Sequence, residues 1–374
     1  MRVVLAGLVV CATAVAAAPA GAALVSGIDF EPAPLEEPAQ DLTIVATGDL
    51  LVHQPVWARA AAYGGGRYDF RPLLRALRPL VRGADLALCH AETPLAPGPP
   101  LGYPVFRTPP ALARAIAWAG FDACSTASNH SVDQGQHGIR TTLRALDRHG
   151  IRHAGTARSR REARRTTILD AGDLRVALLS YTYGTNGLPV PHRFSVNLIR
   201  PAEIRRDARR ARARGADLVL VNLHWGVEYV HRPTAEQRAL ARRLLRGRAI
   251  DLLLGQHAHV VQPIRRVRGR FVVFGEGNLL SAQSSACCPG PTQDGLVAVV
   301  RVRLAGGSPT VRRVDYVPVY VRRPDYTVLR VGVRLDALRR AGRSGSAEAS
   351  ALRASWRRTV SVVGRSRLTR PLRG

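Results

Sequence analysis

Residues 217–260 read DLVLVNLHWGVEYVHRPTAEQRALARRLLRGRAIDLLLGQHAHV, and this stretch decides the fold. An apolar run ends at His224, residues 234–249 have the leucine spacing of a helix, and a second apolar run leads to His257 and His259. A strand, a helix and another strand in this order form a parallel βαβ unit. We therefore expect the histidines that follow both strands to lie at the same edge of one sheet.

The same alternation of strand and helix runs through most of the chain. Apolar runs bounded by turn residues predict strands at 41–49, 85–92 and 121–130, and two strands within 166–181 that turn at Gly172–Asp173. Helical spacing of apolar residues predicts helices at 71–84, 109–120, 138–150 and 201–216. Residues 260–278 and 294–321 alternate with period two around glycine-rich turns, which predicts hairpins in a mixed sheet or in a second packed sheet.

The composition is that of a globular protein with a very basic surface. Apolar residues make up 46% of the 374 residues, an ordinary share for a chain with a sizeable core. All 55 basic residues are arginine, against 27 acidic residues, for a net charge of +28. Two interpretations are open: codon bias toward arginine on solvated helix faces, or attraction to a polyanion. We expect no specific binding to nucleic acid, because no helix-turn-helix, RRM or zinc-finger pattern is present.

The N-terminus has the pattern of an export signal. One arginine precedes an apolar run that breaks at Pro19 among small residues, so residues 1–23 are predicted to be a signal peptide, or else a retained membrane anchor. Residues 24–40, rich in proline and acids, are predicted to be a linker. We expect one domain over 41–322 and a tail of undefined fold over 323–374. The protein should therefore be exported, and either extracellular or membrane-associated.

Export bears on the four cysteines that follow the predicted signal. They are Cys89, Cys124, Cys287 and Cys288. An oxidising compartment permits disulfides, and four cysteines allow three pairings. The sequence leaves all three open, although Cys89 and Cys124 fall at the ends of two predicted strands.

Side chains that can bind metals follow each of the predicted parallel strands. The residues at these strand ends are Asp49 with His53 nearby, His90 and Glu92, Asn129 and His130 with Asp133 nearby, His224, and His257 with His259. Each is weak evidence alone, since an aspartate after a strand is usually a turn residue. His257 and His259 are stronger evidence for a metal site, because residues two apart face the same side of an extended backbone. All these strand ends should meet at one edge of the molecule.

Their chemistry predicts a site for two metal ions. Imidazole nitrogen combined with carboxylate oxygen suits Zn, Fe, Mn or Ni. A single catalytic ion takes about three protein ligands, and these strand ends offer more than that. Two ions about 3.5–4 Å apart, bridged by a carboxylate, would use them all.

The order Asp, carboxylate, Asn–His, His, His-x-His resembles the calcineurin-like metallophosphoesterase superfamily. It is most similar to the CapA (poly-gamma-glutamate capsule biosynthesis) family. The matching segments are TGDLLVHQPVW, CHAETPLAP, STASNHSVDQGQHGIRTTLRALDRHGIRHAGTAR, VNLHWGVEYVHRPTAEQRALARRLL, IDLLLGQHAHVVQPI and VVFGEGNLLSAQ, which cover roughly residues 42–283. The resemblance implies a four-layer α/β/β/α sandwich with mixed sheets and two divalent ions, Mn, Fe or Zn.

The resemblance also implies a role for each residue of the site. Asp49 and His259, with His53 as a third ligand, would hold one ion, and Glu92 would bridge to the other. Asn129, His224 and His257 would hold the second ion. His130 would act as proton donor and Asp133 would orient it. His90, Gln256 and Asn278 would lie behind the ligands. The chain departs from the usual motifs at His53, which stands four residues after Asp49, at His90, and at Gln256.

The function implied is a metal-dependent hydrolase acting on a phosphoester or an amide. The resemblance points to poly-gamma-glutamate or another anionic envelope polymer as partner. Two alternatives stay open. One is a non-catalytic protein that binds or scaffolds such a polymer with the same fold. The other is a metal-dependent peptide-modifying enzyme such as an epimerase, against which the export signal argues.

Overall fold

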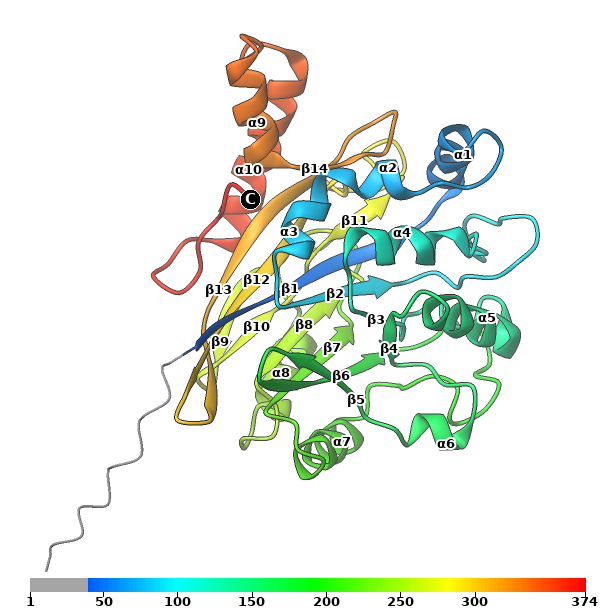
Figure 1. Cartoon of the computed structure of the whole chain (residues 1–374), viewed down its shortest axis with the longest axis vertical. Coiled ribbons are helices and arrows are strands. Elements are labelled where there is room, and N and C mark those ends of the chain that lie inside the picture. The colour runs from blue at the N-terminus through cyan, green and yellow to red at the C-terminus, as the bar shows by residue number, and fades with distance from the viewer. Residues whose placement is uncertain (1–39) are drawn as a thin grey trace, which may run out of the picture. The chain divides into compact units, whose positions relative to one another are not determined.

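The computed structural model describes residues 40–374, so the predicted signal peptide and residues 24–39 of the predicted linker lie outside the described part. Two mixed sheets form its centre (Figure 1). The larger sheet has the strand order β14 (Val328–Arg330), β13 (Ser308–Val321), β12 (Asp294–Ala305), β1 (Gln40–Leu51), β2 (Leu86–Ala91), β3 (Ala123–Ser125) and β4 (Arg152–Ala154), with β11 (Asn278–Ser281) paired to β1. The smaller sheet has the order β5 (Thr167–Ala171), β6 (Leu174–Thr182), β7 (Leu218–His224), β8 (Leu252–Gln256), β10 (Arg270–Val273) and β9 (Ile264–Val267).

Helices cover the outer face of each sheet. The larger sheet is covered by α1 (Gln54–Tyr63), α2 (Arg71–Leu74), the short 3-10 helix η1 (Arg75–Leu77), α3 (Arg78–Arg82), α4 (Ala111–Ala119) and α5 (Gly135–Asp147). The smaller sheet is covered by α7 (Pro201–Ala213) and α8 (Ala235–Leu244). A further short helix, α6 (Arg160–Ala163), precedes β5. The helix predicted at 71–84 is thus divided into three pieces.

Alternation along the strands divides the core into three layers. On β1, Val45 packs against the helices of the larger sheet, whereas Ile44 points into the space between the two sheets. Leu220 of β7 belongs to the same central layer as Ile44, and Val219 packs on the other side, under α7 and α8. Burying both faces of both sheets gives the order helix, sheet, sheet, helix. The predicted four-layer α/β/β/α sandwich is confirmed.

Parallel pairing brings the carboxyl ends of the central strands to one edge. Strand β1 is parallel to β2, with Asp49 opposite His90. Strands β6, β7 and β8 are also parallel, and Thr182, His224 and Gln256 lie in one row across them. The backbone is closely packed here, because a Cβ atom at Gly48 would lie 1.8 Å from the carbonyl oxygen of Gly277. Glycine therefore allows the end of β1 to approach the loop before β11.

The last fifty residues add to the larger sheet. Strand β14 pairs with β13, and α9 (Val331–Arg340) and α10 (Ala347–Val363) follow it. Arg358 of α10 forms an ion pair with the buried carboxylate of Asp294, with Nε and Oδ2 2.7 Å apart. The segment whose fold the sequence left undefined is therefore a strand and two helices. No helix among residues 40–374 is both long and apolar enough to cross a membrane.

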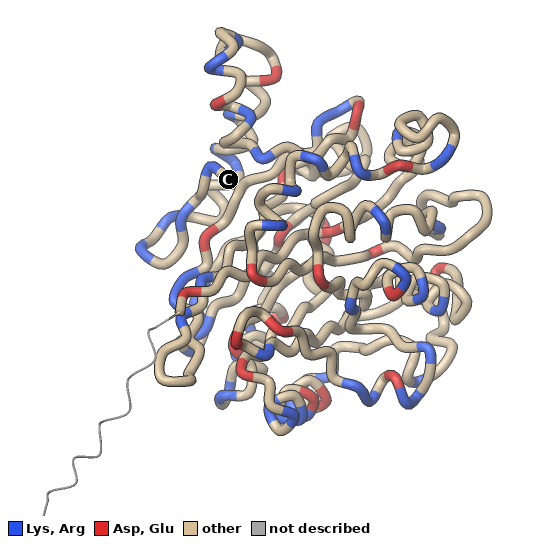
Figure 2. The backbone as a smooth tube through the Cα atoms, in the orientation of Figure 1, with Lys and Arg blue, Asp and Glu red and all other residues tan. Residues whose placement is uncertain are grey.

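The structure selects one of the three cysteine pairings. Cys89 and Cys124 lie opposite each other on β2 and β3, both buried, and are joined by a disulfide. Cys287 is joined to Cys288 in the loop after β11. The arginines, in contrast, do not gather in one place: Figure 2 shows them along helices and loops over most of the described chain.

Candidate metal centre

Ligand-type side chains from both sheets converge at the shared edge. From the larger sheet come Asp49 of β1, Glu92 after β2, and Asn129 after β3; from the smaller sheet come His224 of β7, and His257 and His259 after β8. All six are buried. The structure thus brings together the residues that were expected to meet, except that His53 has another position, described below.

The two histidines after β8 reach the site by a route that the sequence did not indicate. The expectation of an extended backbone here is wrong, because β8 ends at Gln256 and φ is +90° at His257 and +55° at His259. Few residues other than glycine adopt this left-handed region, and it is concentrated at functional sites. A backbone hydrogen bond from Tyr229 to the carbonyl of Ala258 accompanies the turn. The two imidazole rings lie 6.0 Å apart, centre to centre.

Asp49, Glu92 and His259 form the first group. One ligand atom of each lies within 4.8 Å of the other two. Asp49 Oδ2 is 3.1 Å from His259 Nδ1, and Glu92 Oε1 is 3.8 Å from His259 Nε2. This is the carboxylate and imidazole pair predicted for one ion, with Glu92 beside it.

His224 is the centre of the second group. Its Nε2 lies 2.8 Å from Asn129 Oδ1 and 3.8 Å from Glu92 Oε1. The ring of His257 lies 4.7 Å from that of His224. Glu92 therefore stands between the two groups, which is the position a bridging carboxylate requires.

His90 supports His224 from behind. Its Nε2 lies 3.0 Å from His224 Nδ1, and its Nδ1 lies 2.8 Å from the hydroxyl of Ser125. A histidine whose second nitrogen is held in this way keeps a fixed tautomer and ring orientation. Asp49 Oδ1 is also 3.9 Å from His90 Nε2, so His90 itself is within reach of the first group.

Burial controls the charge of these groups. It lowers the pKa of His90 to about 4 and of His257 to about 3, and it holds the pKa of His224 well below its usual value. Burial also raises the pKa of Glu92 far above the ordinary range. His259 differs, because burial alone would lower its pKa but Glu92 and Asp49 raise it to about 9. The lowered pKa values keep His90, His224 and His257 neutral, which is the form in which an imidazole binds metal, whereas binding at Glu92 and His259 would release their protons.

Unpaired polar atoms show that the residues fit a cation. Neither carboxylate oxygen of Glu92 has a hydrogen-bond partner, although the side chain is only 1% exposed. Nδ1 of His257 is also buried without a partner. Buried polar atoms are almost always satisfied, so each exception needs an explanation. A divalent cation coordinated by these atoms would satisfy them.

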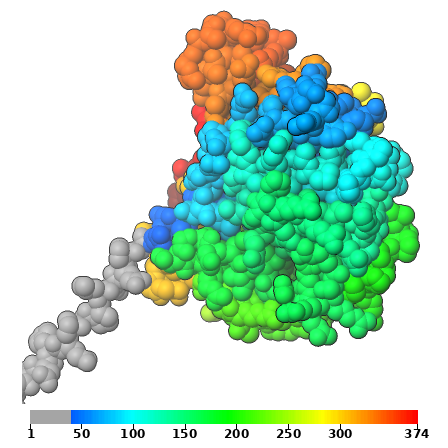
Figure 3. Space-filling model, turned by 45° about the vertical axis from the view of Figure 1, so that its right-hand side comes forward, coloured from blue at the N-terminus to red at the C-terminus, as the bar shows by residue number. Residues whose placement is uncertain are grey.

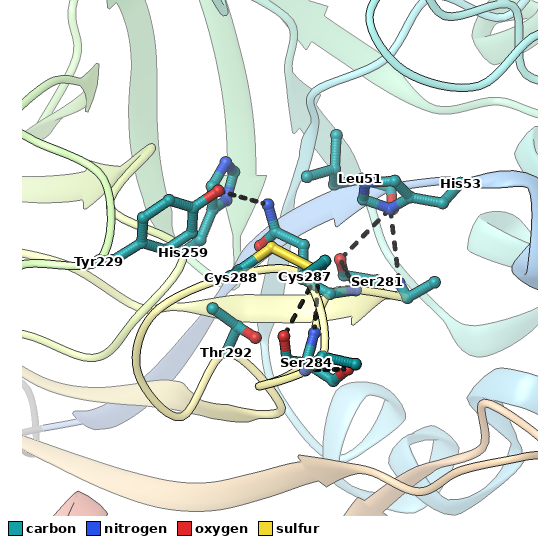
Figure 4. Close-up of a disulfide and its surroundings, with 12 residues drawn as sticks. Leu51, His53, Tyr229, His259, Ser281, Ser284, Cys287, Cys288 and Thr292 are labelled. Carbon is teal, nitrogen blue, oxygen red and sulfur yellow. Dashed lines mark hydrogen bonds between the residues drawn. A yellow bond between two sulfur atoms is a disulfide. The ribbon is translucent and has the colours of Figure 1, made fainter.

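His53 lies outside the groups of ligand atoms found in the described chain. Its Nδ1 is 3.1 Å from the carbonyl oxygen of Leu51 and 3.4 Å from the hydroxyl of Ser281. Figure 4 shows this arrangement, in which His53 and His259 are both drawn around the Cys287–Cys288 loop. The residue precedes α1, whose helical turn begins at Gln54. Its assignment as a ligand stays a prediction.

His130 and Asp133 form a separate pair at the site. His130 Nδ1 lies 2.8 Å from Asp133 Oδ2, and this oxygen also accepts the backbone N–H of Phe106 at 2.7 Å. The Phe106 ring packs edge-on against the imidazole, with centroids 4.7 Å apart. These contacts hold the ring with Nδ1 toward Asp133, so that Nε2 is the free nitrogen.

Gln256 and Asn278 form hydrogen bonds next to the residues that carry the candidate ligands. The amide nitrogen of Gln256 donates to the carbonyl of Thr47 and to the carboxylate of Glu276. Asn278 donates to the backbone carbonyl of His259, at 3.4 Å, and to Gln283 and Thr292, both at 2.9 Å. The first bond connects β8 to β1, which carries Asp49, and the bond from Asn278 connects β11 to the loop that carries His259.

Two further acidic residues lie at or near the site, and the sequence had given a ligand role to neither of them. Glu276 is fully buried, and burial raises its pKa to about 8. Glu228, in the loop after β7, brings a carboxylate oxygen within 4.8 Å of ligand atoms of both His257 and His259. The sequence does contain a signal for each residue. Glu276 stands between two glycines in GEGN, and Glu228 follows His224 by four residues.

Comparison with known proteins gives a match to one family. The family model described as "Bacterial capsule synthesis protein PGA_cap" matches residues 43–283. Capsule biosynthesis protein CapA of Bacillus anthracis is 25% identical over 258 residues, which are 65% of this chain and 61% of that protein. PGA biosynthesis protein CapA of Bacillus subtilis is 28% identical over 166 residues, or 44% of this chain and 43% of that protein. The chain thus spans about half the length of these relatives.

Among solved structures, the calcineurin-like phosphoesterase YfkN from Bacillus subtilis aligns with 84% of this chain and 100% of its own, at 16% identity and a TM-score of 0.48. The 5'-nucleotidase precursor from Thermus thermophilus aligns with 78% of this chain and 54% of its own, at 16% identity and a TM-score of 0.45.

Proposed function

Because this chain belongs to the PGA_cap family of bacterial capsule synthesis proteins, we propose that it is an exported, metal-dependent hydrolase that acts on an anionic polymer of the cell envelope. The observation that carries the proposal is the buried, unpaired carboxylate of Glu92 between two sets of ligand atoms. Ligands arranged in this way suit two cations. A pair of cations at such a site is suited to catalysing hydrolysis. The polymer we propose is poly-gamma-glutamate or a chemically similar polyanion.

The ligand groups suggest how two ions would be held. Asp49 and His259 would hold one, Asn129, His224 and His257 the other, and Glu92 would bridge them. Mn, Fe or Zn suits these nitrogen and oxygen ligands. Divalent ions supply positive charge that polarises a phosphoryl or carbonyl oxygen and lowers the pKa of water.

Two residues of this chain, His130 and Asp133, would transfer the proton to the leaving group. Asp133 accepts the Nδ1 proton of His130, and this fixes the ring so that Nε2 faces away from Asp133. A protonated Nε2 donates to the oxygen or nitrogen that leaves when the bond breaks. Phe106 packs edge-on against the same ring and helps to hold it in place. His130 therefore acts as general acid, with Asp133 as its positioning residue.

The first test is metal content joined to a substrate panel. We expect purified protein to hold two divalent ions per chain and to hydrolyse phosphodiesters or gamma-glutamyl amides. His257→Ala should abolish turnover. Wild-type turnover that survives complete removal of metal would contradict the proposal. Full metal occupancy without turnover on any substrate, together with salt-sensitive binding of polyglutamate, would instead identify a polymer-binding protein.

The second test concerns location. We expect a C-terminally tagged protein to be found outside the cytoplasm, in the medium or with the membrane. Protein found wholly in the cytoplasm would overturn the proposed export, and would favour the peptide-modifying alternative over a role at the envelope.

A further inference from the structure

A second concave site lies between the edges of the two sheets, apart from the metal centre. Its volume is about 590 Å³. Its walls come from β4, from the segment between α6 and β5, from β6 and from the end of α7. Figure 3 shows a hollow among the green residues of this face. None of the residues assigned to the metal centre lines it.

The walls are strongly basic. The charged residues that line the cavity are Arg152, Arg158, Arg165, Arg175 and Arg214, with Asp147 and Glu162. Both acids are already paired with one arginine, Arg158. The other four guanidinium groups form no ion pair with a carboxylate of the described chain. We call this cavity the arginine pocket.

Local structure holds several of these groups at the cavity. Arg214 Nη1 donates to the carbonyl of Arg164 at 3.1 Å and to the hydroxyl of Thr166 at 3.0 Å, which ties α7 to the wall before β5. Arg175 lies against Gly215, where a Cβ atom would come within 2.1 Å of its Nη1. A side chain at position 215 would therefore displace the guanidinium.

The other end of the same wall is anchored to β4. The hydroxyl of Thr167 donates to the carbonyl of His153 at 2.7 Å. The segment 164–167 is thus fixed at both ends, by Arg214 and by β4, and it carries Arg165 between them. The four unpaired arginines are as exposed as Arg242 and Arg243 of α8, but they differ from those two in lining one concavity.

The pocket has a polar floor that is built by the same segments as the metal centre. The hydroxyl of Ser180 is buried there and accepts the backbone N–H of Ala127, which lies two residues before Asn129. Ser180 in turn precedes Thr182, the residue opposite His224. Arg152 and Arg175 lie at the starts of β4 and β6, whereas Ser180 is near the end of β6, so the pocket extends along these strands toward the edge that carries the metal centre.

We propose that the arginine pocket binds successive carboxylates of an acidic polymer and holds the chain beside the metal centre. Guanidinium groups match carboxylates by paired hydrogen bonds. Four such groups from separate elements favour several anionic groups on one chain over a single compact anion, because simultaneous contacts on one chain reinforce each other. The choice of polymer rests on the proposed function, whereas the binding itself requires no metal chemistry.

The test compares full-length wild type with the double variant Arg152→Ala, Arg175→Ala. Binding of poly-gamma-glutamate is measured by calorimetry at two salt concentrations. We expect the affinity to fall by roughly tenfold or more, because charge-assisted hydrogen bonds are lost. The matched control is Arg242→Ala, Arg243→Ala, which removes the same charge from α8 and should bind as wild type does. An equal loss in both double variants would show attraction by net charge alone and would overturn the proposal.

A second comparison separates this site from the metal centre. Hydrolysis of a small ester should be unchanged in the double variant, whereas His257→Ala should lose hydrolysis and keep polymer binding. If neither the wild type nor any variant shows hydrolysis, the proposed enzymatic function is wrong. The binding measurements still show whether the arginine pocket binds the polymer. Binding of inorganic polyphosphate at the pocket without binding of polyglutamate would contradict the carboxylate assignment.

Discussion

His130 Nδ1 lies 2.8 Å from Oδ2 of Asp133, and the backbone N–H of Phe106 donates to that same oxygen. The carboxylate therefore holds both the imidazole and the loop that packs against it. Asp133 belongs to none of the ligand groups. Its effect should be limited to the orientation and the proton of His130.

Asp133→Asn should lower kcat while leaving the metal content unchanged. The amide oxygen can still accept the N–H of Phe106 and the Nδ1 proton of His130, but the negative charge that stabilises a protonated His130 is lost, so we expect a loss of roughly 10–100-fold in kcat. Steady-state kinetics with metal analysis of the same sample measure both quantities. An unchanged kcat would remove the residue from the mechanism, and a loss of metal would show a structural role instead.

Glu92→Gln should abolish the stabilisation that metal confers. The substitution keeps the shape of the side chain but removes the charge that faces both ligand groups. A ligand that binds only the folded state raises the melting temperature, and the rise grows with the logarithm of the ligand concentration above Kd. We expect Mn²⁺ or Zn²⁺ to raise the Tm of wild type and to leave that of Glu92→Gln almost unchanged. An equal rise in both proteins would exclude Glu92 as a ligand.

Glu228→Gln should weaken the binding of metal without unfolding the protein. Its carboxylate lies near both His257 and His259 and is only partly buried, so the fold should tolerate the change. We expect the affinity for one ion to fall roughly 10–100-fold, the usual effect of losing a group that supports a metal site. Calorimetric titration of metal-free protein measures it, with Glu203→Gln on α7 as the control. Identical titrations for both variants would place Glu228 outside the site.

Glu276 should make stability depend on pH. Burial raises its pKa from 4.5 to about 8 in the folded protein. Between these values the folded state holds a proton that the unfolded state has lost, so the free energy of unfolding falls as pH rises. Glu276→Gln has no proton to lose, and it should remove this part of the slope.

The measurement is urea unfolding of wild type and Glu276→Gln at about pH 5 and about pH 8, where the difference between the two proteins should change by a few kcal/mol. Glu203→Gln serves as a control, because its carboxylate lies on α7 and is 40% exposed. A constant difference between wild type and Glu276→Gln at both pH values would show that the carboxyl ionises normally.

Much of the metal centre could be predicted before the structure. Asp49, Glu92, Asn129 and His224 each follow an apolar strand, and parallel strands bring their carboxyl ends to one edge. The pattern of apolar residues specifies each of those strands locally. The order of the strands along the chain was therefore enough to predict that their ends meet. The four-layer sandwich could be inferred for the same reason, with the resemblance to a family as support.

Other features could not be predicted, because they depend on contacts between residues far apart in the chain. The left-handed turn at His257 and His259 coincides with a bond from Tyr229, and the side chain of His53 turns to Leu51 and Ser281. The burial of Glu276 comes from the close approach of β1 to the loop before β11.

The sequence by itself determined the sheets and the chemical types of the residues at their ends, because strand formation follows from local alternation of apolar residues. The tertiary structure decided which of those residues meet, which cysteines pair, and where four arginines surround one pocket. These depend on register and loop closure across two sheets, which no local pattern records. Arg152 and Arg214 are 62 positions apart in the chain, yet they line the same cavity.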